Sequence, residues 1–142
     1  QAFLDGAPNI GRLFEDYDLI EADYARRTGI FPIMHLLGVQ RELAERDPEL
    51  CLRVCDAFEA SRRYAVGRTN ESQAPFTSLP WAPKEAARSR QVLGDSFWSY
   101  GVDANRPALQ SLCEYSYAQG ISARPVIVDE LFVPVTLGWT PS

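Results

Sequence analysis

His35 is the first candidate for chemistry, because it is the chain's single histidine and any imidazole acid or base that the chain supplies must be this residue. Its neighbours in the run from 29 to 39 carry no charge. Two interpretations are open from position alone. His35 either moves protons at a site, or it lies in a core with its ring bonded to a backbone carbonyl.

An arginine pair that precedes this run suits an anion. Arg26, Arg27 and Thr28 place two guanidinium groups and a hydroxyl next to the flexible Gly29. Such a group can hold a carboxylate, because arginine donates two parallel hydrogen bonds to it. The alternative is a solvated arginine pair at the end of an acidic stretch, which is common on protein surfaces.

An aromatic cluster, Phe97-Trp98-Ser99-Tyr100-Gly101, is followed by an amide and a guanidinium at Asn105 and Arg106. Trp98 and Arg106 are therefore candidates to contact a ligand in a pocket. The alternative is a structural clamp, in which the rings pack the following helix onto the body and Asn105 caps the start of that helix.

The three cysteines point to packing rather than to ligation. Cys51 and Cys55 are one helical turn apart, and Cys113 belongs to another helix. A zinc site would need a fourth ligand, for which His35 is the only nitrogen candidate, and an odd number of thiols makes no disulfide framework. We expect three free thiols and no metal.

Several local signals predict the helices that must position these residues. A long helix should run from the Asp47-Pro48 start to about Gly67, and Pro83 and Gly94 should bound a second. A third should run from Asn105 or Pro107 to Gln119, with Gly120 as a left-handed cap. In the long helix we expect the stripe Leu50, Val54, Ala57, Phe58, Ser61 and Ala65 to pack and the face with Glu49, Arg53, Asp56, Glu59 and Arg63 to be wet.

The remaining segments predict loops and one strand. Residues 5–11 and 68–82 carry turn formers and should be exposed connections. The apolar run from Ile30 to Gln40 lacks helical periodicity and contains Pro32, so we expect a buried strand there. Val126–Val128 should be a short strand or extended arm, followed by one helical turn at 129–132. A lone buried strand needs partners, so we favour an α/β fold whose other strands lie outside this chain over a helical fold with one odd strand.

Composition excludes some classes of protein. The chain has 142 residues, 46% of them hydrophobic, and a net charge of -5. Lys84 is its only lysine, so nucleic-acid binding through phosphate neutralisation is disfavoured. The longest apolar stretch is far shorter than the ~20 residues of a membrane span. The chain begins within apolar sequence at Gln1 rather than at Met, so we expect a cut or processed end.

Several blocks read together resemble the 4,5-dihydroxyphthalate decarboxylase family. They are Asn9–Phe14, Tyr24-Ala-Arg-Arg-Thr-Gly-Ile-Phe-Pro-Ile-Met-His35, Phe97–Arg106, Tyr115–Gly120 and Glu130–Phe132. All of them belong to the C-terminal portion of such proteins. The resemblance implies part of a type II periplasmic-binding-protein-like fold of two α/β lobes, mostly helical here with one or two strands. Residues of about 1–29 would be a crossover segment, and about 30–142 the strand and helices of the first lobe.

The resemblance also implies a carboxy-lyase of aromatic compound catabolism, in the degradation of phthalates. Such an enzyme releases CO2 from a dihydroxy-dicarboxylate to leave a dihydroxybenzoate, without a cofactor that the sequence requires. On this view His35 is the acid or base, Arg26 or Arg27 anchors a carboxylate with help from Thr28, and Trp98 and Arg106 contact the substrate. The partners would be a small aromatic carboxylate, an N-terminal lobe and further copies in a homo-oligomer, in the cytoplasm.

Two alternatives remain open. The first is a non-catalytic, transporter-type solute-binding protein for a small aromatic acid or related solute, which would be periplasmic and could use the same arginines. The second is a structural lobe that assembles with another chain.

Overall fold

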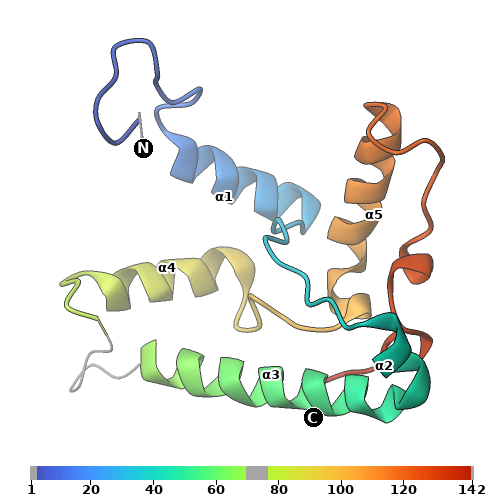
Figure 1. The fold of residues 1–142 in the computed structure, drawn as a ribbon. Helices are drawn as coiled ribbons and strands as arrows, with labels where there is room; N and C mark the ends of the chain where they lie inside the picture. The colour runs from blue at the N-terminus through green and yellow to red at the C-terminus, as the bar shows by residue number, and fades with distance from the viewer. Residues whose placement is uncertain (1–2, 70–76, 142) are drawn as a thin grey trace.

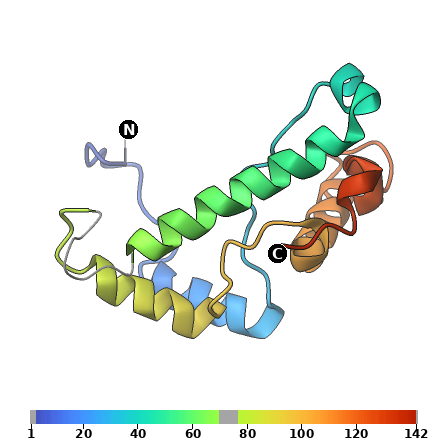
Figure 2. The same cartoon turned by 90° about the horizontal axis from the view of Figure 1, so that it is seen from below.

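The computed structural model describes residues 3–69 and 77–141 of the chain, and within these ranges it is helical without a strand. The α-helices are α1 (Tyr17–Thr28), α2 (Arg41–Arg46), α3 (Pro48–Thr69), α4 (Ala82–Leu93) and α5 (Val102–Ala118). Two short 3-10 turns follow, η1 (Val128–Leu131) and η2 (Pro134–Thr136). The long α3 runs along one side of the molecule (Figure 1). The helices α1 and α4 lie side by side at one end, and α5 stands at the opposite end, near α2 (Figures 1 and 2).

The predicted α/β fold is therefore wrong for the residues that the structure describes, and with it the expected part of a two-lobed α/β protein. Ile30–Gln40 is extended, but no described segment pairs with it. An extended chain becomes a strand only when a neighbour completes its hydrogen bonds, and Pro32 has no N–H to offer. The segment is not buried either, since Met34, Leu36 and Leu37 are each about three-fifths exposed.

The local helix signals are confirmed. The backbone N–H of Leu50 donates to Oδ1 of Asp47 at 3.1 Å, which caps the start of α3 as expected. Gly120 has a φ of 71° and ends α5, where the N–H of Ile121 donates to the carbonyl of Ser116 at 2.8 Å. The start of α5 differs, because the helix begins at Val102 and takes Pro107 inside it.

The predicted faces of α3 are partly wrong. Glu59, expected in solvent, is only 4% exposed, whereas Phe58, expected to pack, is 47% exposed. Leu50 and Val54 of the expected stripe are half-buried, but its later members Ala57, Phe58, Ser61 and Ala65 are exposed. Cys51, Cys55, Glu59 and Arg62 are covered as well and lie at helical spacing, so the covered face is rotated relative to the expected apolar stripe.

The loop at 5–11 and the last helical turn follow the expectations, and the connection at 68–82 does so only in part. Residues 5–11 form turns, and the single turn predicted at 129–132 is η1, one residue earlier. Of the expected connection at 68–82, positions 70–76 lie outside the described residues, and 68–69 complete α3. In the rest, Leu79 and Trp81 are 67% and 70% exposed. No helix in the described ranges is long and apolar enough to cross a membrane.

The buried core lies at the C-terminal end of the chain. Val102, Leu109, Cys113 and Val128 form it, and four half-buried apolar residues pack against it, namely Ile33, Val126, Phe132 and Leu137. In contrast, α1 and α4 contain no buried residue. The chain exposes 11010 Å², roughly half as much again as the ~7,400 Å² typical of a compact monomer of this mass. Much apolar surface therefore remains uncovered.

Candidate functional site

An apolar groove of about 720 Å³ lies on the described part of the chain. The extended segment 29–39 forms one wall, and α3 contributes Cys51, Val54, Cys55 and Phe58. The loop before α5, the start of α5 and the C-terminal segment around Leu131–Trp139 complete it. The groove is thus built by four segments that are far apart in the sequence.

His35 and Trp98 both line this groove. His35 is exposed on the extended segment, which contradicts the interpretation of a core histidine bonded inside the protein. Trp98 is 54% exposed, and its ring centroid lies 6.2 Å from that of Phe31. The structure therefore brings together the predicted acid or base and one predicted substrate contact on the same hollow.

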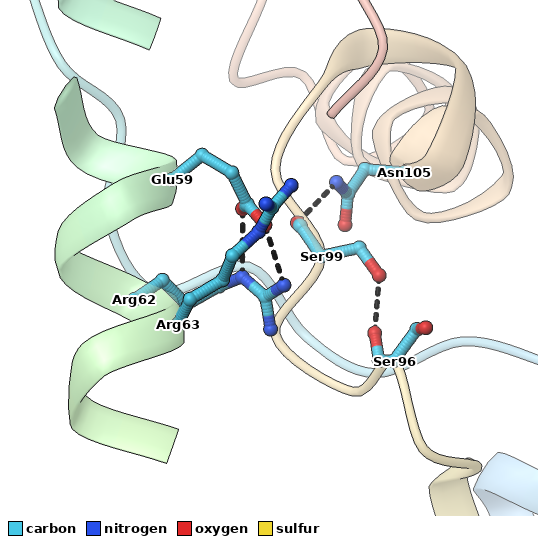
Figure 3. Close-up of polar contacts among 6 residues, drawn as sticks. All are labelled: Glu59, Arg62, Arg63, Ser96, Ser99 and Asn105. Atoms are coloured by element: carbon cyan, nitrogen blue, oxygen red, sulfur yellow. Dashed lines mark hydrogen bonds and ion pairs between the residues drawn. The ribbon is translucent and has the colours of Figure 1, made fainter. Parts of the chain in front are cut away.

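The loop that carries Trp98 is held by hydrogen bonds from a single amide. Nδ2 of Asn105 donates to the carbonyl of Ser99 at 2.8 Å and to that of Gly101 at 2.9 Å. The hydroxyl of Ser99 also donates to the carbonyl of Ser96 (Figure 3). Asn105 is not the N-cap that we expected, because α5 begins three residues earlier and the side chain points back to the loop.

The predicted carboxylate anchors lie at the C-terminal end of α1 and do not line the apolar groove. Nε of Arg27 donates to Oδ2 of Asp23 at 2.8 Å, one helical turn back. The hydroxyl of Thr28 donates to the carbonyl of Tyr24 at 2.7 Å and accepts from the N–H of Ile30 at 3.1 Å. Arg26 lines a separate, smaller hollow between α1 and α4. The residues on either side of this group, Ala25 and Gly29, do line the apolar groove.

Arg106 joins α5 to η1. Its guanidinium donates to Oδ1 of Asp103 at 2.9 Å and to Oδ1 of Asp129 at 2.8 Å. Hydrogen bonds to Asp129 and then to Asp103 raise the pKa of Arg106 above its ordinary value. Since two carboxylates occupy it and it does not line the groove, its predicted contact with substrate would require these ion pairs to open.

Sequence reasoning missed a buried ion cluster on α3. Oε2 and Oε1 of Glu59 accept from Nε and Nη2 of Arg62 at 2.8 and 2.7 Å, and Oε1 also accepts from Nε of Arg63 at 2.8 Å. The bonds from Arg62, more than those from Arg63, lower the pKa of Glu59 to about 2. Figure 3 shows this cluster beside the loop that Asn105 holds. The signal was the spacing of an acid and two arginines three and four residues later.

A second missed contact ties the C-terminal segment to α3. Nε1 of Trp139 donates to Oδ1 of Asp56 at 2.9 Å. The two residues are far apart in the sequence, so no local pattern predicts the bond. Trp139 also lines the groove, and this bond therefore helps to fix one of its walls.

The three thiols are free of disulfides, as expected. Cys51 and Cys55 line the groove, and burial, more than nearby Asp56, raises the pKa of Cys55 above its ordinary value. A raised pKa keeps the thiol protonated at neutral pH and therefore weakly nucleophilic. Cys55 thus contributes apolar surface to the groove rather than a thiolate.

Comparison with known proteins supports the resemblance seen in the sequence. No protein-family profile matches the chain. The chain is 36% identical over 132 residues to a 4,5-dihydroxyphthalate decarboxylase of Comamonas testosteroni. The match covers 93% of this chain and 40% of that enzyme. The chain is therefore similar to one part of a decarboxylase and spans less than half of its length.

Proposed function

We propose that this chain forms part of a decarboxylase that converts an aromatic dihydroxy-dicarboxylate, of the 4,5-dihydroxyphthalate type, to a dihydroxybenzoate and CO2. The observation that carries the proposal is the 36% identity, over nearly the whole chain, to an enzyme of that name. The groove supports it independently. Its volume of about 720 Å³ lies within the range of small-molecule pockets, and its mostly apolar lining suits an aromatic compound.

The reaction needs few groups from the protein. A ring hydroxyl para to the departing carboxylate loses its proton, and its electron pair moves into the ring. The ring carbon that carries the carboxylate then takes up a proton. The carbon–carbon bond breaks as CO2 leaves, its electron pair restores the aromatic ring, and the hydroxyl is reprotonated. One proton is consumed overall and no electron is gained or lost, so proton transfer and charge placement are the protein's tasks.

His35 is the proposed acid and base, because it is an exposed imidazole on the wall of this groove. The apolar residues around it, such as Phe31 and Leu36, would favour loss of the charged carboxylate by removing its water. Arg26 or Arg27, with Thr28, remains the proposed anchor for the carboxylate that is retained. These residues directly precede Gly29, where the groove begins.

The test is an assay of CO2 release from 4,5-dihydroxyphthalate by the polypeptide of the complete reading frame. One equivalent each of CO2 and a dihydroxybenzoate per substrate would support the proposal. Binding without CO2 release would instead favour the solute-binding alternative, and neither binding nor release would contradict both. Cell fractionation adds a second readout, since the enzyme is proposed to be cytoplasmic and the solute-binding alternative periplasmic.

A further inference from the structure

The loop between α4 and α5 holds a tryptophan in a backbone conformation that favours glycine. Trp98 has a φ of 65° and, in the described part of the chain, is the one residue other than glycine with a positive φ. A bulky side chain is rarely found there, because its Cβ crowds the backbone. Such a conformation persists only where the surrounding structure imposes it, and it is typical of functional sites.

Two sets of contacts hold the loop that carries Trp98. Asn105 holds the carbonyls of Ser99 and Gly101 with one amide group, at 2.8 and 2.9 Å. Figure 3 shows the bond to Ser99. Gly101, with a φ of 101°, lies so close to Trp139 that an added Cβ would be 3.2 Å from its carbonyl oxygen. The loop is therefore fixed on both sides of Tyr100, directly after Trp98.

The result of this arrangement is a pair of aromatic rings that the protein leaves open. The rings of Trp98 and Phe31 are 6.2 Å apart and tilted by 42°. Trp98 is 54% exposed and Phe31 41%, and both line the groove. A purely structural clamp would bury these rings, whereas here more than half of the tryptophan faces solvent. Open aromatic faces suit another planar ring, which stacks offset or edge-on against them.

We propose that Trp98 and Phe31 form a platform on which the substrate's aromatic ring lies, and that Asn105 is the positioning residue that holds Trp98 in place. The ring's identity as a dihydroxyphthalate rests on the proposed function. The platform itself rests on the loop geometry and the two open rings. It accounts for a tryptophan at a position where glycine would fold with less strain.

The experiment measures dissociation constants by calorimetry for the polypeptide of the complete reading frame and its variants. The probes are 4,5-dihydroxyphthalate, phthalate and the saturated cyclohexane-1,2-dicarboxylate, which carries two carboxylates without an aromatic ring. Trp98→Gly should weaken binding of the two aromatic acids roughly 10-fold and leave binding of the saturated acid within about 2-fold. Trp98→Phe should retain most of the affinity, because a ring remains.

Stability separates this role from a structural one. Trp98→Gly should keep or raise the unfolding temperature, because glycine adopts a positive φ without strain. Trp81→Gly removes a tryptophan that is 70% exposed and does not line the groove, and it should leave all three affinities unchanged. A Trp98→Gly protein that unfolds, or that binds the aromatic acids like wild type, overturns the platform.

A double-mutant cycle tests Asn105. Asn105→Ala should raise KM for the aromatic substrate with little change in kcat, and it should have no further effect on binding in the Trp98→Gly background. Additive losses in the double variant would overturn the positioning role.

Aromatic acids that bind through Trp98 without CO2 release would contradict the proposed decarboxylation but support the platform. CO2 release that is unchanged in the Trp98 variants would support the proposed decarboxylation but contradict the platform.

Discussion

The two ends of this chain are built differently. At the C-terminal end, α5 and η1 bury Val102, Leu109, Cys113 and Val128 against one another. At the N-terminal end, α1 buries nothing, and the segment from 30 to 40 that follows it exposes Met34 and most of its other side chains. The C-terminal end packs on itself, whereas the segment from 30 to 40 carries His35 and one wall of the groove. The buried core and the proposed acid or base therefore lie in different regions, although the start of α5 also lines the groove.

The largest expected effect is on activity and comes from the loosely packed region. In the polypeptide of the complete reading frame, His35→Gln should lower kcat for 4,5-dihydroxyphthalate by about 10²- to 10⁴-fold, with a much smaller change in KM. The fold should be unaffected, because the side chain is exposed. Steady-state kinetics and a thermal melt measure both. A variant with wild-type kcat would remove His35 from the mechanism.

Substitutions in the packed C-terminal region should lower stability rather than activity. Leu109 is 2% exposed, so Leu109→Ala should lower the free energy of unfolding by about 2–5 kcal/mol. Leu19 on α1 is 60% exposed, and Leu19→Ala should change it by less than about 0.5 kcal/mol. Urea denaturation of both variants tests the contrast. Equal losses would mean that α1 is packed as tightly as α5.

Exposed apolar surface should also make the 142-residue chain associate when it is isolated. Leu36 and Leu37 are 62% and 59% exposed on the extended segment, and burying each is worth about 1.5–3 kcal/mol. Replacing both by Asp should therefore weaken self-association by at least about 100-fold. Sedimentation equilibrium measures this. A monomeric wild-type chain at micromolar concentration would contradict the expectation, which rests on these side chains and not on a strand edge.

The ion cluster on α3 should make part of the stability depend on pH. The pKa of Glu59 falls from 4.5 to about 2 on folding, because Arg62 and Arg63 bind its carboxylate. Between these values the unfolded state holds more protons, so stability is full above pH 4.5 and decreases as the pH falls toward 2. Glu59→Gln should cost about 1.5–3 kcal/mol at pH 7, since it removes charge-assisted bonds.

The control for this cluster is Glu114→Gln, which changes an exposed glutamate on α5. It should alter the free energy of unfolding by less than about 0.5 kcal/mol at any pH. Denaturation at pH 7 and pH 3 distinguishes the two variants. The difference between wild type and Glu59→Gln should shrink at the lower pH, and a constant difference would mean that the carboxylate's charge is not what stabilises the native state.

Local signals predicted the parts of this fold that local physics determines. Asp47 caps the start of α3 with its side chain and Gly120 ends α5 with a positive φ, so their neighbours in sequence suffice to identify them. The segment 30–40 was misread because a strand depends on a partner elsewhere in space. The rotation of α3 that buries Glu59 likewise depends on which elements pack against the helix.

The candidate site was predictable only in part, for the same reason. His35 and Trp98 are unusual in type, and both lie on the groove. Asn105 was singled out as a helix cap, but it does not cap α5, and its bonds to the carbonyls of Ser99 and Gly101 cross a loop whose path no spacing rule gives. The arginines at 26 and 27 are close to His35 in the sequence, yet a helix end directs them away from the groove.

The smallest expected effect on stability is at Arg27. Its ion pair with Asp23 is exposed, with side chains 64% and 62% accessible, so Arg27→Met should cost less than about 0.5 kcal/mol in the free energy of unfolding. Arg53→Met breaks a similarly exposed pair with Asp47 and is the matched control. Denaturation should show little difference between them.

Substrate affinity should distinguish the Arg27→Met variant from the Arg53→Met control. If Arg27 anchors a substrate carboxylate, Arg27→Met should weaken binding by about 1.5–3 kcal/mol, whereas Arg53→Met should not change it. The substrate must then displace Asp23, whose carboxylate is only 2.8 Å from Nε of Arg27. Asp23→Asn should therefore tighten binding, because the neutral amide competes less well for the guanidinium. Calorimetry on the three variants tests both the expected loss and the expected gain in substrate affinity. If no variant changes the affinity, Arg27 is a surface residue of α1 and another residue anchors the carboxylate.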